Sequence, residues 1–192
     1  MRICAIDTDT RSPGYAIFDG VKCIEHGIIP LKRGNRIRDV FAKWMLDLVS
    51  RSDILVIEDQ FIPKKKPNVA KSMLYLAAAR GKLELFFELE GKRVVRLMAF
   101  KWQSDVLWTT ARKNKPWMNR EEAERRTKMV AEEIVGGGVT NADVASAICI
   151  GSYFARLYQV HGDLALDIAT QSKKKTKVSA TKRGQTRGGK KR

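Results

Sequence analysis

The stretch RICAIDTDTRSPGYAIFDG, residues 2–20, decides the fold, because it joins two apolar segments through a turn and carries an acid inside the first one. Residues 2–8 alternate weakly and predict a β-strand. Asp7 stands near the end of that strand, where a carboxylate is costly unless it is paired or bound to a cation. Asp9 follows two residues later and, as strand residues two apart share a face, would point the same way.

The elements that follow predict an α/β domain. Residues 14–18 and 22–29 read as two more strands, joined at Asp19-Gly20, a favoured hairpin pair. The remaining predictions are a helix over 35–50, a strand over 53–60, a long helix over 69–90 that is apolar on most sides and expected to be central, a strand over 92–97, a short helix over 100–108, and helices over 120–135 and 140–158. Three strands in hairpin succession, followed by strands that alternate with helices, predict a mixed sheet, antiparallel first and parallel later, flanked by helices.

The charge of the chain indicates a polyanionic partner. The 192 residues carry 37 Lys and Arg against 21 Asp and Glu, a net charge of +16. The last 20 residues hold ten basic residues and no acid, and the rest of the chain still carries +6. Because both parts are basic, nucleic acid is the expected partner. We expect one folded domain over residues 1–160 and a basic, disordered tail over 161–192.

Cysteine usage and hydropathy limit the compartment. Cys4, Cys23 and Cys149 are odd in number and widely spaced, which fits neither a disulfide framework nor a zinc site and indicates a reducing environment. The sequence shows no signal-peptide pattern and no run of about 20 apolar residues that could span a membrane. We therefore expect an intracellular protein without a membrane partner, cytoplasmic and associated with the nucleoid, or in the host cell if the source is viral.

Three acids stand where solvation alone would not place them. Asp7 lies near the end of the first strand, Glu58 ends the apolar strand LVIE, and Asp143 lies in the first turn of the last helix. Carboxylates around two divalent ions about 4 Å apart are a standard means of hydrolysing a phosphodiester, because one ion activates water and the other stabilises the leaving oxygen. Magnesium, a hard cation that prefers oxygen ligands, suits this role.

Each acid also has a purely structural interpretation. Asp7 could be a turn residue at a strand end, and Glu58 could be an ordinary polar strand end. Thr140 and Asp143 in TNAD fit the capping-box pattern, so they could simply cap the last helix. The three acids together, in this strand order and in a basic chain, favour a metal site over coincidence.

Four motifs in order resemble the RuvC family of Holliday-junction resolvases, in the RNase H-like nuclease superfamily. ICAIDTDTRSPGYAIFDG (3–20) resembles the family's opening strand and hairpin, with an Asp followed by Gly-Tyr. LVIEDQF (55–61) resembles its second motif, a strand-end Glu with an aromatic three residues on. AAARGKLE (77–84) resembles the helix that follows, and NADVASAICIGSYFAR (141–156) resembles the last motif, an Asp that opens an Ala-rich helix. The match runs from residue 1 to about residue 158.

The resemblance implies an RNase H-like, five-stranded mixed sheet and an endonuclease that resolves four-way DNA junctions by paired symmetric nicks as a homodimer. It implies that Asp7, Glu58 and Asp143 ligate two Mg²⁺ ions, for which Mn²⁺ would substitute, and we expect no small-molecule cofactor. It also implies that Phe61 stacks near the junction centre, where base–aromatic stacking contributes about 1–3 kcal/mol. A half-buried loop anchor is the alternative for Phe61.

The chain departs from the family at the usual fourth ligand, an Asp or His one turn before the last Asp. Thr140 occupies that position, and its neutral neighbour Asn141 is expected to face elsewhere. Either three carboxylates suffice, or another acid substitutes, or the protein binds junctions without cutting them. Asp9 is the candidate substitute, and a turn-forming Asp before RSPG is its equally open alternative.

Basic residues supply candidate DNA contacts. Lys64, Lys65 and Lys66 in the loop IPKKKPN could contact phosphates or form a solvated charge run. Arg80, in an otherwise apolar helix, is expected to hold a phosphate bidentately beside the site. The remaining candidates are Lys113, Lys115, Arg125, Arg126 and Lys128.

The leading hypothesis is therefore a magnesium-dependent, structure-selective DNA endonuclease acting on four-way junctions. One alternative keeps the fold and changes the substrate to flaps, forks or RNA in hybrids, because the fold does not choose the substrate. The other is a non-catalytic architectural junction binder, which Thr140 and the basic tail favour.

Overall fold

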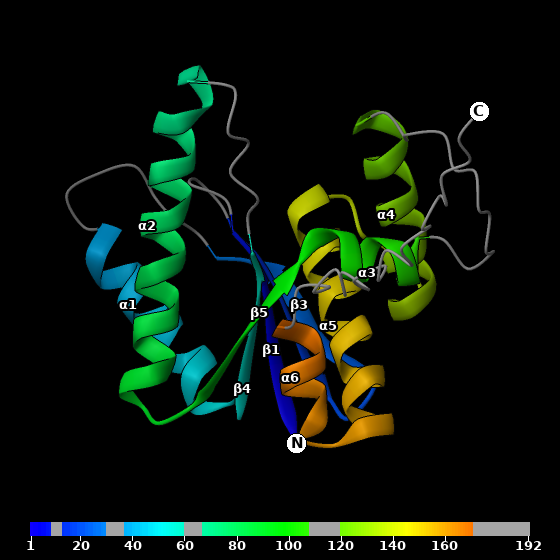
Figure 1. Ribbon diagram of the computed structural model, residues 1–192, viewed down its shortest axis with the longest axis horizontal. Coiled ribbons are helices and arrows are strands. Elements are labelled where there is room, and N and C mark those ends of the chain that lie inside the picture. The colour runs from blue at the N-terminus through cyan, green and yellow to red at the C-terminus, as the bar shows by residue number, and fades with distance from the viewer. Residues whose placement is uncertain (9–12, 30–36, 60–66, 108–119, 171–192) are drawn as a thin grey trace, which may run out of the picture.

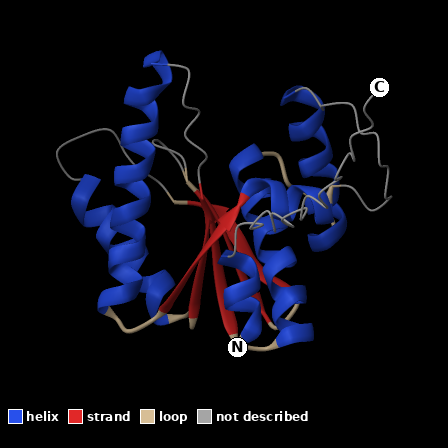
Figure 2. Ribbon diagram, viewed as in Figure 1, coloured by secondary structure: helices blue, strands red, loops and turns tan. Residues whose placement is uncertain are grey.

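A five-stranded sheet with helices on both faces forms the body of the protein (Figures 1 and 2). The computed structural model describes residues 1–8, 13–29, 37–59, 67–107 and 120–170. The strands are β1 (Arg2–Asp7), β2 (Gly14–Asp19), β3 (Lys22–Ile28), β4 (Ile54–Asp59) and β5 (Arg93–Met98). The helices are α1 (Ile37–Ser50), α2 (Pro67–Leu89), α3 (Ala99–Val106), α4 (Arg120–Val135), α5 (Ala142–His161) and α6 (Leu164–Thr170).

The sheet has the strand order β3-β2-β1-β4-β5. β1, β2 and β3 pair antiparallel, and the β2–β3 hairpin turns at Gly20, whose φ of 57° lies in the left-handed region that glycine adopts without strain. β4 and β5 join as parallel strands. The predicted mixed sheet, antiparallel first and parallel later, is confirmed.

The central strands β1 and β4 are covered on both faces, which explains their continuous apolar runs. Ile3 and Ala5 pack toward α5, whereas Cys4 and Ile6 pack into a second core with residues of α1 and α2. Figure 1 shows the same division, with α1 and α2 on one side of the sheet and α3 to α6 on the other. Strand alternation therefore assigns the buried side chains of β1 and β4 to one of two cores.

The central helix is α5. Ten of its residues are buried, and a side chain at Gly151 would collide with the ring of Phe18 in β2. The prediction that the helix over 69–90 is central is wrong, because Leu74, Leu85 and Leu89 of α2 are 70%, 52% and 75% exposed. An apolar circumference usually indicates burial on all sides, yet α2 covers the sheet with one flank and presents the other to solvent.

The packed chain continues beyond residue 160. α6 buries Ala165 and Ala169 completely, and Lys101 Nζ of α3 donates to the carbonyl oxygens of Ile168 (2.5 Å) and Ala169 (2.9 Å). These bonds satisfy carbonyls in the last turn of α6, which have no partner within the helix. Residues 164–170 are thus a packed helix and not part of a disordered tail, and residues 171–192 lie outside the described ranges.

Two expectations drawn from composition can be compared with the structure. Cys4, Cys23 and Cys149 are all free thiols; Cys4 and Cys149 are buried. No helix within the described ranges combines the length and the apolar character that crossing a bilayer requires.

Candidate active site

Asp7 and Glu58 lie at the carboxyl ends of two neighbouring central strands, β1 and β4. β1 and β4 run parallel, and the register pairs Ile6 with Ile57, so the two acids follow directly after a paired position. Alternation places both on the face that packs against α5, together with Ala5 and Val56. The structure therefore brings together two of the three acids expected from the sequence.

Asp143 enters from the helix that covers this face. It lies in the first turn of α5, and Asn141 is the N-cap, because its side-chain oxygen accepts from the amides of Asp143 (2.8 Å) and Val144 (3.0 Å). The alternative interpretation, in which Thr140 caps the helix, is wrong, since the helix begins one residue later than TNAD suggests and Thr140 is exposed. Asn141, expected to face elsewhere, instead holds the turn that carries the acid.

Gly14 lies where the first turn of α5 contacts the β1–β2 strand pair. It is the register partner of Asp7 in the β1–β2 ladder. A Cβ atom at position 14 would collide with the backbone carbonyl group of Asp143 and the amide nitrogen of Val144. The first turn of α5 therefore packs directly on β2, one strand away from Asp7, and the third acid starts from the same end of the sheet.

The three acids lie at the same end of the sheet, but their side chains do not form a closed cluster. Among the described residues, no three or more His, Cys, Asp or Glu side chains gather closely enough to hold a metal ion. Carboxylates that approach one another repel unless a cation lies between them. Asp9, the candidate fourth acid, lies outside the described residues.

Glu58 has a partner that the sequence did not single out. The indole nitrogen Nε1 of Trp102, in α3, donates to Glu58 Oε1 at 2.9 Å. Burial raises the pKa of Glu58 above its ordinary value; the hydrogen bond from Trp102 opposes this shift and the charge of Asp59 adds to it. Trp102 lies in the predicted short helix after the last strand, and no pattern within that segment connects it to Glu58.

Asp59, next along β4, turns to the opposite face and binds Arg80. Arg80 Nη1 lies 2.6 Å from Asp59 Oδ1, and its Nε lies 3.5 Å from Glu84 Oε1. Glu84, whose side chain is only 7% exposed, also accepts two hydrogen bonds from Arg96, both 2.9 Å long. The guanidinium expected to hold a phosphate thus belongs to an ionic network, formed by Asp59, Arg80, Glu84 and Arg96, that ties α2 to β4 and β5.

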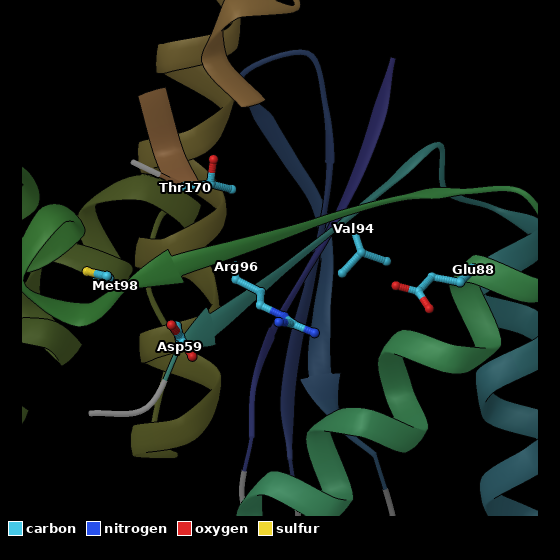
Figure 3. A pocket seen from close by; sticks show the side chains of 6 residues that line it. All are labelled: Asp59, Glu88, Val94, Arg96, Met98 and Thr170. Carbon is cyan, nitrogen blue, oxygen red and sulfur yellow. The ribbon is translucent and has the colours of Figure 1, made fainter. Parts of the chain in front are cut away.

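A cavity of about 370 Å³ opens beside this network (Figure 3). Its lining residues are Asp59, Glu88, Val94, Arg96, Met98 and Thr170. Val94 and Arg96 alternate along β5 with Val95 and Leu97, which belong to the core under α5. The cavity therefore opens beside β5, the last strand in the sheet order, on the α2 side of the sheet and not on the side of Glu58 and Trp102.

Solved structures share this architecture. A structure titled "T. thermophilus RuvC in complex with Holliday junction substrate" matches with a TM-score of 0.60 and 11% identity, over 84% of this chain and 97% of that one. The Thermus thermophilus RuvC structure matches with a TM-score of 0.57 and 12% identity, over 83% and 96% of the two chains. The fold is RNase H-like. No protein-family model and no curated protein sequence matches the chain.

The predicted DNA contacts are distributed unevenly over this RNase H-like fold. Arg125 and Arg126 both bind Glu122 on α4, at 2.9 and 2.7 Å. Lys128 is partly exposed on the same helix, which packs on α5 (Figure 1). The other candidates lie outside the described residues: Phe61, Lys64, Lys65, Lys66, Lys113 and Lys115.

Proposed function

We propose that the protein is a magnesium-dependent endonuclease that cuts branched DNA and resolves four-way junctions by paired symmetric nicks. The observation that carries this proposal is the placement of Asp7 and Glu58 on adjacent parallel strand ends, on one face, beneath the start of α5. Gly14 holds the first turn of α5, with Asp143, beside them. This arrangement supports the assignment of the three acids as catalytic.

The donor set suits magnesium. Asp7, Glu58 and Asp143 offer only carboxylate oxygens, which Mg²⁺ prefers and Mn²⁺ also accepts. Glu58 already accepts a hydrogen bond from a group that only donates, and a carboxylate has about four acceptor sites. Glu58 can therefore bind a cation without losing Trp102. Two bound ions would activate water and stabilise the leaving oxygen at the phosphodiester.

Charge and symmetry support a junction as the substrate. The net charge of +16 favours a nucleic acid, and the similar Thermus RuvC structure contains a Holliday junction substrate. A symmetric junction has two equivalent strands to cut, so a homodimer would supply one site for each. We therefore propose branched DNA and a second copy of this chain as the partners.

The decisive experiment incubates the protein with a synthetic four-way junction and Mg²⁺. We expect paired symmetric nicks, and Asp7→Asn should reduce the nicking rate to below about 1%, since loss of even an outer-shell partner of a metal costs about 10–100-fold. Asp19→Asn is the matched control. Asp19 is an exposed residue at the end of β2, and its register partner is Arg2, at the opposite end of the β1–β2 ladder from Asp7. Absence of nicking with both Mg²⁺ and Mn²⁺ would refute the enzymatic proposal. Adding forks, flaps, RNA–DNA hybrids or linear duplex as competitors of the junction would rank these substrates by how strongly each one inhibits nicking.

One observation favours a second candidate, a junction binder without catalysis. An exposed threonine, Thr140, stands where the resemblance expects a fourth ligand. A two-ion site should raise the unfolding temperature at millimolar Mg²⁺, because a ligand that binds only the folded state stabilises it. Tight junction binding with no such shift would support the binder.

A further inference from the structure

The hydrogen bond between Trp102 and Glu58 joins two elements that are distant in the chain. Trp102 is 2% exposed and belongs to the core beneath α5, whereas Glu58 lies near the end of β4. The donor–acceptor distance is 2.9 Å. A buried indole N–H usually has a hydrogen-bond partner, and here that partner is a carboxylate of the proposed active site.

The backbone explains how the tryptophan reaches the acid. β5 pairs with β4 so that Leu97 lies opposite Glu58, and α3 begins at Ala99, immediately after β5 ends. Long side chains in helices lean toward the helix N-terminus, so a residue in the first turn of α3 leans back toward the strand ends. Trp102 occupies that turn, and Figure 1 shows α3 leading directly from β5.

α3 is itself held in place. Lys101, next to Trp102, donates to two carbonyl groups in the last turn of α6, at 2.5 and 2.9 Å. The tryptophan is therefore fixed from two sides, by its own burial and by the attachment of its helix to α6. A donor fixed in this way keeps one carboxylate oxygen in a defined place.

We propose that Trp102 is a positioning residue for the metal-ligating carboxylate of Glu58. The inference rests on the proposed nuclease function. The indole N–H has no acceptor capacity and cannot ligate a cation. It occupies one acceptor position of Oε1, fixes the orientation of the carboxylate, and leaves the remaining acceptor positions for a cation. Partners of this kind, outside the ligand shell, typically contribute 10–100-fold to metal affinity or activity.

The test measures metal binding directly, by calorimetric titration of the full-length protein with Mn²⁺ alone. Trp102→Phe removes the N–H and keeps an aromatic ring in the core. We expect its dissociation constant for Mn²⁺ to rise by about 10–100-fold. Junction nicking at low Mg²⁺ should fall accordingly and recover as Mg²⁺ is raised, whereas the KM for the junction should stay unchanged.

Two further variants separate positioning from packing. Trp44→Phe makes the same chemical change on the other face of the sheet, where Trp44 packs on Tyr15 with ring centroids 5.7 Å apart, and it should leave Mn²⁺ affinity unchanged. Benzothienylalanine at position 102 keeps the bicyclic shape without the N–H and should weaken Mn²⁺ binding as Trp102→Phe does. It also covers the case in which the phenylalanine variant does not fold.

The outcomes distinguish the two proposals. If the unmutated protein binds Mn²⁺ through Asp7 and Glu58 but the benzothienylalanine protein binds it equally well, the positioning role is overturned and the nuclease proposal stands. If the unmutated protein neither binds Mn²⁺ nor nicks junctions, the nuclease proposal falls, and the role of Trp102 falls with it.

Discussion

Strand alternation gives two consecutive acids different environments. Glu58 points to the α5 face and accepts from Trp102, whereas Asp59 points to the α2 face and binds Arg80. The first is a candidate metal ligand and the second anchors a long helix. Neighbouring residues of β4 thus have different roles: Glu58 belongs to the proposed active site, and Asp59 holds α2 against the sheet.

The Arg80–Asp59 pair should stabilise the fold. Arg80→Met keeps the aliphatic stem and removes the guanidinium; the Arg80 side chain is 20% exposed and that of Asp59 is 34% exposed. We expect the free energy of unfolding to fall by about 1–2 kcal/mol, because hydrogen bonds between charged groups contribute about 1.5–3 kcal/mol when shielded and less when partly exposed. Urea denaturation measures the change.

Arg125→Met is the matched control for this prediction. Arg125 binds Glu122 on the surface of α4 with its side chain 60% exposed, so its removal should leave stability unchanged. Equal stability of the two variants would contradict the structural role of Arg80. Weaker DNA binding by Arg80→Met at unchanged stability would restore the predicted phosphate contact.

The sequence predicted the position of each acid better than its partners. Asp7 and Glu58 could be placed on strand ends because a period of two and an apolar run define a strand. The partners Trp102 and Arg80 are 44 and 21 residues away from the acids they bind. Those contacts depend on how β5, α3 and α2 pack, and a local pattern does not contain that information.

At the scale of elements, the start of α5 combines a cap and a candidate ligand in one turn. Asn141→Ala removes the oxygen that accepts from the amides of Asp143 and Val144. We expect a decrease of about 1 kcal/mol in the free energy of unfolding, measured by urea denaturation. The affinity for Mn²⁺ should also fall, since Asp143 loses the cap that fixes its backbone.

Thr140→Ala is the control, one residue earlier in the same loop. Thr140 is exposed and is not the cap, so this variant should unfold at the same urea concentration as the unmutated protein. If Thr140→Ala were instead less stable than Asn141→Ala, the capping box suggested by TNAD would be supported.

Helix roles were harder to predict than helix positions. For α1 to α5 the predicted and observed bounds agree within a few residues, because apolar spacing defines these helices, whereas α6 was expected to be part of the tail. The length and apolar character of α2 suggested a central helix, but α5, which is rich in small residues, has that place. Ala and Gly allow close approach to a sheet, and Gly151 against Phe18 shows that approach directly. The average apolar character of a helix does not indicate how closely that helix can approach the sheet.

At the scale of the whole molecule, charge is the dominant property. Deleting residues 173–192 removes ten positive charges and leaves the elements of the described fold, which end with α6, intact. We expect weaker junction binding and a shallower dependence of log K on log salt, by about 0.9 for each phosphate that the tail neutralises. Fluorescence anisotropy across a salt series measures both.

Stability and cleavage pattern should survive this deletion. The acids and their supporting elements all lie before residue 171. A truncated protein that binds with an unchanged salt slope would show that the tail makes no phosphate contacts. Loss of junction preference on truncation would assign the tail a part in selectivity beyond its charge.

The close approach of Gly14 to the backbone of Asp143 has a consequence for tracing relatives of this protein. Overall identity to the Thermus RuvC chain is 11%, so most side chains differ although the architecture is shared. Any side chain at position 14 would collide with the backbone of Asp143 and Val144, so we expect glycine at this position wherever the same helix packs on the same strand. An aspartate followed seven positions later by glycine, with a later aspartate one residue inside an alanine-rich helix, is therefore a genomic search pattern suited to lineages this divergent.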